Sequence, residues 1–64
     1  MLITVNAEPR EVTDGTTIAD LVAELPHRGV AVAVDGTVVR RSQHAERTLA
    51  EGDRVEIVTA VQGG

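Results

Sequence analysis

The sequence contains no cysteine and no phenylalanine, tryptophan or tyrosine. Without cysteine, neither a disulfide framework nor a thiolate metal site can stabilise the chain. The hydrophobic core must therefore be built from valine, leucine, isoleucine and alanine. A chain of 64 residues forms one domain and buries only roughly 60% of the surface that its unfolded form exposes, so its small core must pack well.

Lysine is also absent: all six basic residues are arginine, against ten acidic residues. The formal net charge of -4 repels phosphate backbones, which bind proteins through lysine and arginine. The lack of aromatic rings also removes the usual platform for stacking single-stranded bases. We therefore expect no nucleic-acid partner. Without lysine, the chain also has neither a Schiff-base amine nor an isopeptide acceptor.

No run approaches the roughly 20 apolar residues that a membrane-spanning helix needs. The first residues, MLITVN, read directly as a strand, without a basic leader or an apolar signal core. We expect a cytoplasmic protein with no membrane contact.

The first half of the chain predicts a hairpin. Alternating apolar residues over 1–5 indicate a strand with Leu2 and Thr4 on one face. Asn6 and Pro9 then indicate a turn, and residues 11–13 are expected to return as a short, charged edge strand.

One stretch has the period of an amphipathic helix. Asp14–Gly15 breaks the chain before it, Thr17 and Asp20 match a capping box, and Pro26 disfavours helical conformation at the preceding residue. A helix is therefore expected between these breaks, with one apolar stripe formed by Ile18, Leu21, Val22 and Leu25.

Residues 30–34, VAVAV, are apolar on both faces, which is typical of a strand covered on both sides. Asp35–Gly36 predicts a tight hairpin with 37–39 as the returning strand. Residues 40–53 are polar and irregular, with Leu49 expected to insert into the core.

The last segment, RVEIVTA, alternates again. This period predicts a strand with Val55 and Ile57 facing inward and with Arg54, Glu56 and Val58 facing outward.

This order of elements predicts an α+β domain in which one helix packs on one face of a mixed sheet of four to five strands. The pattern resembles the ubiquitin-like β-grasp, with the first and last strands side by side at the centre. We expect the β-grasp domain to span 1–59 and a flexible C-terminal tail to span 60–64.

Side-chain catalysis finds little support in the sequence. Ser42 and His44 lie two residues apart in a polar loop with no third orienting group, and we interpret them as a solvated surface pair. The spacing of His27 and His44 matches no metal site. His27 follows the predicted helix, where an imidazolium would favour the helix dipole. We expect neither an enzyme nor a metal site.

The chain stops at Gly63–Gly64. An α-carboxyl group titrates near about 3.3 to 3.7, so at neutral pH it is an anionic oxygen nucleophile that needs no general base. Glycine, having no side chain, can pass through a narrow channel. Four extended residues after Ala60 reach roughly 13 to 14 Å, far enough to enter the active site of another protein.

The whole chain resembles the ThiS family, the small sulfur carrier proteins of thiamin (thiazole) biosynthesis. The stretches VAVAVDGTVVRRS and LAEGDRVEIVTAVQGG and the Gly-Gly end carry this resemblance. It implies that the Gly64 carboxylate is adenylated by a partner enzyme and becomes a thiocarboxylate, which donates sulfur to thiazole synthase. Val61, Gln62 and Gly63 would lie in the partner's active-site channel.

The implied partners are an adenylating enzyme of the kind that activates ubiquitin-like proteins, thiazole synthase and a sulfur donor protein. ATP and Mg would be used by the adenylating partner, and this chain would bind no cofactor. Two positions depart from the family: Asn6–Ala7 stands where Asn-Gly is frequent, and His44 stands where an aromatic residue is frequent.

For partner docking, the alternation of the strands places Val58 and Thr4 on the face away from the helix. Arg41 could meet an acidic partner surface. Other functions stay open at this point: a molybdopterin-type sulfur carrier, a non-catalytic β-grasp binding or regulatory module, and a ubiquitin-like protein modifier.

Overall fold

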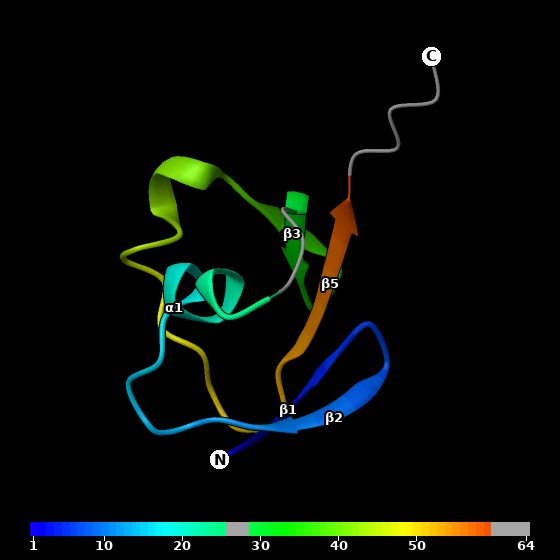
Figure 1. Ribbon diagram of the computed structural model, residues 1–64, viewed down its shortest axis with the longest axis vertical. Helices are drawn as coiled ribbons and strands as arrows, with labels where there is room; N and C mark the ends of the chain where they lie inside the picture. The colour runs from blue at the N-terminus through cyan, green and yellow to red at the C-terminus, as the bar shows by residue number, and fades with distance from the viewer. Residues whose placement is uncertain (26–28, 60–64) are drawn as a thin grey trace.

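Figure 1 shows the computed structural model, which describes residues 1–25 and 29–59. Their secondary structure consists of β1 (Leu2–Val5), β2 (Glu8–Glu11), α1 (Ile18–Ala23), β3 (Gly29–Val34), β4 (Thr37–Val39), the 3-10 helix η1 (Arg41–Gln43) and β5 (Arg54–Thr59).

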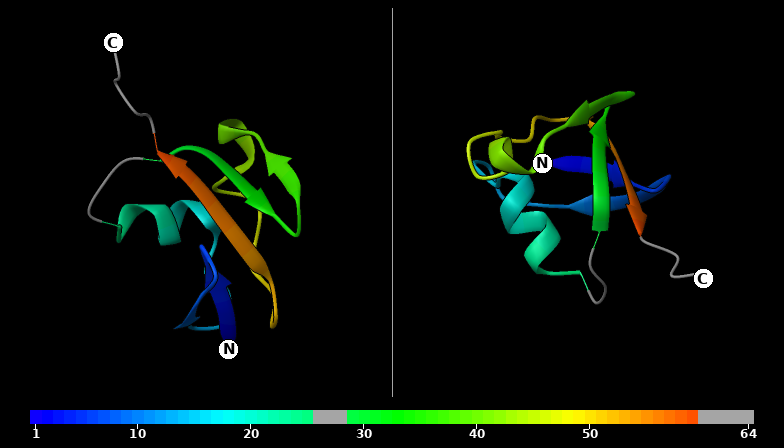
Figure 2. Two further views of the ribbon diagram at one scale, coloured as in Figure 1. Left: turned by 90° about the vertical axis from the view of Figure 1, so that its right-hand side faces the viewer. Right: turned by 90° about the horizontal axis from the view of Figure 1, so that it is seen from above.

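The strands form one mixed sheet in the order β2-β1-β5-β3-β4. The central strand, β5, is parallel to β1, with Val5 opposite Val55, and antiparallel to β3, with Val34 opposite Val55. The first and last strands are thus neighbours, as predicted. Helix α1 packs on one face of the sheet (Figure 2). The predicted α+β, ubiquitin-like β-grasp architecture is confirmed.

The core lies between α1 and the sheet. Ile18 and Leu21 of α1 are fully buried against strand residues such as Ile3 and Val55. Leu49 inserts from the loop before β5, as expected. The full buried set is Ile3, Ile18, Leu21, Val32, Val34, Val39, Leu49, Val55 and Ile57. Aliphatic side chains alone therefore fill the core of the described residues.

The amino end of α1 has a partner for every backbone N–H that a helix leaves unpaired there. The predicted capping box is confirmed: Thr17 N–H donates to Asp20 Oδ2, and Asp20 N–H donates to Thr17 Oγ1, both at 3.1 Å. Ile18 N–H donates to the carbonyl of Arg47, and Ala19 N–H to that of His44, both at 3.0 Å. The loop after β4 thus completes the cap.

At its other end, α1 stops at Ala23 with Glu24 as C-cap. Leu25 lies past the helix but still packs against the core. His27, for which a capping role was predicted, lies outside the described residues.

The first hairpin differs from the prediction. Val5 pairs with Glu8, so the turn consists of Asn6–Ala7 alone, and β2 spans Glu8–Glu11 rather than 11–13. The prediction treated Pro9 as part of the turn. Pro9 instead pairs with Thr4 within β2, an edge strand, where a residue without an N–H is tolerated.

The prediction for β3 was half wrong. Val32 and Val34 are buried under α1, but Ala31 and Ala33 are only half-buried on the opposite face, which no other described element covers. Alanine reads as apolar in sequence, yet its small side chain is tolerated on a surface. We call this opposite side of the sheet the outer face.

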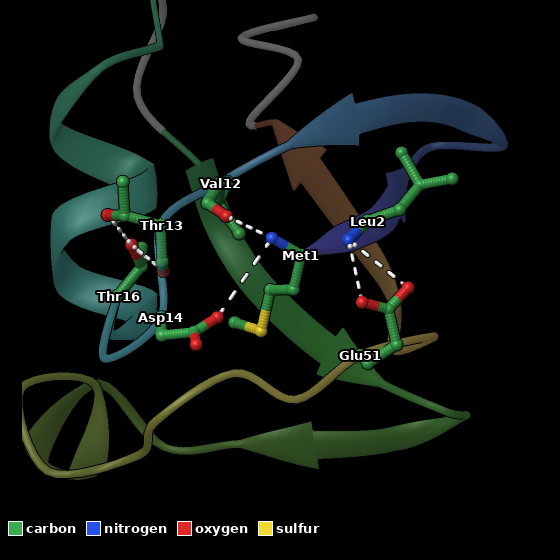
Figure 3. Close-up of polar contacts among 7 residues, drawn as sticks. All are labelled: Met1, Leu2, Val12, Thr13, Asp14, Thr16 and Glu51. Carbon is green, nitrogen blue, oxygen red and sulfur yellow. Dashed lines mark hydrogen bonds and ion pairs between the residues drawn. The ribbon is translucent and has the colours of Figure 1, made fainter.

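The start of β1 is tied to two loops (Figure 3). The Met1 nitrogen donates to the carbonyl of Val12 at 2.7 Å and lies 4.0 Å from the Asp14 carboxylate. Leu2 N–H donates to both carboxylate oxygens of Glu51, at 3.1 and 3.2 Å. These contacts fix the segment before α1 and the segment before β5 around the same strand.

Among the helices of residues 1–25 and 29–59, none has the length and apolar character to cross a membrane.

Candidate functional site

The central strand β5 ends at Thr59, the last described residue, and the predicted reactive residues follow it in the sequence. At its start, Asp35 N–H donates to the carbonyl of Arg54 at 2.8 Å, and Arg54 N–H donates to Asp35 Oδ1 at 3.0 Å. The turn between β3 and β4 therefore fixes the first residue of β5.

Near its other end, β5 is held by the turn between β1 and β2. Asn6 N–H donates to the carbonyl of Val55 at 2.8 Å, and Ile57 N–H donates to Asn6 Oδ1 at 2.8 Å. Asn6 Nδ2 also donates to the Ile57 carbonyl at 3.4 Å. One side chain thus contacts both backbone groups of a residue two positions before the end of the strand.

The outer face carries an apolar band across three strands. Val58 of β5 is 63% exposed and lies opposite Ala31 of β3, and Val38 of β4 is 68% exposed and lies opposite Ala33. Side chains paired in this way are close neighbours on one face of a sheet. We call Val58, Ala31, Ala33 and Val38 the outer band. It begins on the strand that leads to the C-terminus.

The predicted docking residues lie on three separate elements. Val58 and Thr4 do share the outer face, as predicted, but Thr4 pairs with Arg54, four positions before Val58 on β5. At about 3.3 Å per residue they are roughly 13 Å apart. Arg41 is exposed in η1, beyond the edge strand β4. The structure therefore does not gather these three residues into one cluster.

The sequence interpretation missed Ala31, Ala33 and Val38 as companions of Val58. Their signal was available in the alternation of β3 and β4, because each occupies the parity opposite a buried valine. It also missed Asn6, which nothing in the sequence pairs with a residue 51 positions away.

The remaining polar candidates form no catalytic arrangement. Ser42 is exposed, whereas His44 is partly buried and its Nε2 lies 3.0 Å from the carbonyl of Val39. The imidazole thus contacts the backbone of β4, and the solvated pair expected from the sequence is wrong for the histidine. Among residues 1–25 and 29–59, no group of three histidine, aspartate or glutamate side chains could hold a metal.

Two of the open grooves among the described residues adjoin these elements. One runs beside β4 and η1 along Val38, Gln43 and Arg47, and the other lies between Asn6, Arg10 and Leu25. Among the described residues that line them, neither has a histidine. The predicted reactive end, Gly64, and the channel residues Val61, Gln62 and Gly63 lie outside the described residues.

A β-grasp sheet with β5 leading out of its centre is the geometry on which the sequence resemblance can be judged. The model of the ThiS family matches residues 3–64. The chain belongs to the ThiS family. The match covers the sheet, the helix and the Gly-Gly end together, so it extends over the whole fold and over the predicted reactive terminus.

Two solved structures agree with membership of the ThiS family. The crystal structure of a thiamine biosynthesis protein (ThiS) from Geobacter metallireducens is 28% identical, with a TM-score of 0.80 and coverage of 100% of both chains. The solution structure of a thiamine biosynthesis protein from the same organism is 29% identical, with a TM-score of 0.80, and covers 100% of this chain and 88% of that one. No curated protein matches the chain significantly.

Proposed function

We propose that this ThiS-family chain is a sulfur carrier for the thiazole of thiamin and carries sulfur as a thiocarboxylate on Gly64. The observation that carries the proposal is the family match over residues 3–64, which includes the terminal glycines. The two similar Geobacter metallireducens proteins, both described as thiamine biosynthesis proteins, support the same pathway. The chain itself acts as a co-substrate of its partners rather than as an enzyme.

The proposed chemistry uses the main-chain carboxylate. Its oxygen attacks the α-phosphorus of ATP in the adenylating enzyme, pyrophosphate leaves, and an acyl adenylate forms. The outer sulfur of a donor-protein persulfide then displaces AMP at the carbonyl carbon, and a thiol breaks the S–S bond of this acyl disulfide, so that the thiocarboxylate leaves and the thiol forms a disulfide with the donor. ATP and Mg belong to the adenylating enzyme, and Val61, Gln62 and Gly63 occupy its channel. Thiazole synthase then accepts the sulfur. All of these steps take place in the cytoplasm.

We place the docking surface for the adenylating enzyme on the outer band, around Val58. Two observations support this position. The band contains two exposed valines, Val38 and Val58, on a sheet face that no described element covers, and Val58 lies on the strand that precedes residues 60–64 in the sequence. A partner that binds those residues would contact the end of the sheet at which β5 stops. Thr4 and Arg41 would lie at the margin of that contact.

Intact-protein mass spectrometry tests the chemistry. The chain is incubated with ATP, Mg, a ThiS-type adenylating enzyme and a sulfur donor, and the exchange of one oxygen for sulfur is expected at Gly64. The matched control deletes Gly64, which should abolish the mass change while the circular dichroism spectrum stays that of the folded chain. An unchanged mass for the intact chain, under conditions that modify a known carrier, would refute the proposal.

The docking surface is tested separately with Val58→Ser and Leu2→Ser. Both side chains are exposed and apolar on the outer face, but Leu2 lies at the start of β1, away from the end of β5. We expect Val58→Ser to slow adenylation and Leu2→Ser to leave it unchanged. Equal adenylation rates for the two variants would show that the adenylating enzyme does not dock around Val58. Supplying thiazole synthase or a molybdopterin-forming enzyme as acceptor then decides the pathway.

A further inference from the structure

The Asn6 side chain continues the ladder of hydrogen bonds between β1 and β5 after β1 has ended. Thr4 N–H donates to the carbonyl of Asp53 at 3.0 Å, and Asn6 N–H donates to that of Val55 at 2.8 Å. In a regular parallel ladder, the next bond would join Ile57 N–H to the backbone carbonyl of residue 6. The chain turns away there, and Asn6 Oδ1 accepts that bond instead.

Asparagine is suited to this position for two reasons. It accepts a bond from Ile57 N–H through Oδ1 and donates one to the Ile57 carbonyl through Nδ2, so both backbone groups are contacted. It also tolerates the left-handed backbone that the turn requires, with φ of 51° at Asn6. Aspartate would keep the backbone conformation and the acceptor but lose the Nδ2 donor, and glycine would keep the backbone conformation alone.

The Asn6 bonds matter on this edge of β5 because the backbone pairing with β1 stops before β5 ends. Among the described residues, backbone pairing with β1 ends at Val5 opposite Val55. On the other edge, Ile57 pairs with Val32 and Val58 with Ala31, and the register shifts only before Thr59 pairs with Gly29. Asn6 is thus the support for Ile57 on the β1 side. Val58 lies between Ile57 and Thr59, so its direction on the outer face depends on both neighbours.

We propose that Asn6 is a positioning residue for the carrier reaction: it holds the end of β5 so that Val58 meets the adenylating enzyme in one orientation. This inference rests on the proposed function. Without the Asn6 amide, the end of β5 samples more conformations, and docking must select among them. The expected signature is a higher KM for the carrier with little change in kcat, because the reacting carboxylate is untouched.

Two substitutions at this position separate the clamp from the turn. Asn6→Gly preserves the left-handed backbone and removes both side-chain bonds, whereas Asn6→Asp retains the acceptor for the 2.8 Å bond. The matched control is Thr17→Ala, which removes the helix cap on the far side of the core and lowers stability without touching β5.

Two quantities are measured on the full chain. The first is the amide hydrogen exchange rate of Ile57 divided by that of Val55, which cancels global unfolding. The second is the pair of constants KM and kcat for pyrophosphate exchange with the adenylating enzyme. For Asn6→Gly, both the exchange ratio and KM should rise roughly two- to tenfold, the value of one modest hydrogen bond. Asn6→Asp should fall in between, and Thr17→Ala should change neither.

An Asn6→Gly chain with the KM of the wild type, or a Thr17→Ala chain with the same rise in KM, would overturn the inference. Either result would leave the proposed function intact, because the wild-type chain would still be adenylated. If the wild-type chain supports no pyrophosphate exchange, the proposed function itself fails. The two failures are therefore read from different arms of one experiment.

Discussion

The two hairpins of this protein have the same turn and different residues in it. Both loops contain two residues, and both central residues have positive φ: 51° and 70° at Asn6–Ala7, and 52° and 84° at Asp35–Gly36. This is the geometry of a type I′ turn, which matches the twist of the flanking strands. The first turn places alanine where the second has glycine, and alanine has a Cβ that the left-handed conformation disfavours.

The hairpins also share a task. From opposite edges of β5, the first residue of each turn accepts a backbone N–H of that strand: Asp35 Oδ1 at Arg54, and Asn6 Oδ1 at Ile57. At Arg54, the Asp35 backbone N–H meets the strand carbonyl. At Ile57, the carbonyl is left to the side-chain amide. In both hairpins, therefore, the first turn residue stabilises a strand that its own turn does not connect.

The largest expected effect comes from removing each reaching side chain. Asn6→Ala puts a second left-handed alanine in the first turn and removes two bonds, so we expect a loss of about 1.5 to 2 kcal/mol in the free energy of unfolding. Asp35→Ala should lose about 1 kcal/mol, because it has the same left-handed backbone cost but removes one solvent-exposed bond instead of two. Urea unfolding followed by far-ultraviolet circular dichroism measures both. Equal losses would mean that the Asn6 and Asp35 side chains contribute equally to the free energy of unfolding.

Gly36→Ala makes the second turn resemble the first. An added Cβ at Gly36 would meet no atom within 4 Å, so its cost comes from the backbone conformation with φ of 84°. We expect a loss of about 1 kcal/mol in the free energy of unfolding, measured by urea titration. A neutral result would show that the sheet tolerates a left-handed alanine at both turns.

Ala7→Gly is the reciprocal change and should stabilise the protein. Relief of the left-handed alanine outweighs the greater entropy that glycine adds to the unfolded chain, for a net gain of about 0.5 kcal/mol. A shift of the thermal unfolding midpoint to higher temperature is the measurement. A lower midpoint would mean that the alanine methyl group contributes packing that outweighs its backbone cost.

Arg54→Gln should have the smallest effect. The Arg54 guanidinium lies 3.9 Å from the Asp35 carboxylate, and both side chains are largely exposed. Exposed ion pairs of this kind contribute little, so we expect a change below about 0.5 kcal/mol that is further reduced by salt. Unfolding in low and high salt measures it. A larger loss would mean that Asp35 stabilises the protein mainly through its ion pair with the Arg54 guanidinium, and not through the bond that it accepts from the Arg54 backbone N–H.

Local signals predicted most of this fold. Asp35–Gly36 identified its hairpin because glycine meets the demand for positive φ, and Thr17 with Asp20 identified the start of α1 because both halves of a capping box lie within one turn. The turn at Asn6 was predicted, but its end was not, because Ala7 lacks the glycine signal that marks the second position of such a turn. Because proline is typical of turns, Pro9 was assigned to the turn, and the second strand was predicted to start at residue 11 instead of Glu8.

Long-range contacts through backbone atoms could not be predicted. The carbonyls of His44 and Arg47 that complete the cap of α1 belong to groups that every residue has, so no residue type identifies them. The bond between Asn6 and Ile57 likewise depends on where the parallel strand places residue 57. The outer face was predictable for Val58 and Thr4 by alternation. The roles of Gly64 and of the residues before it stay predictions.

The cap of α1 has a consequence for how the chain folds. A helix of six residues is too short to persist alone in water, and two of its first N–H groups find acceptors only in the second half of the chain. The helix therefore cannot serve as an early nucleus. It must consolidate together with the docking of residues 44–47, which makes folding depend on contacts of long sequence separation and ties the helix and the late loop into one cooperative step.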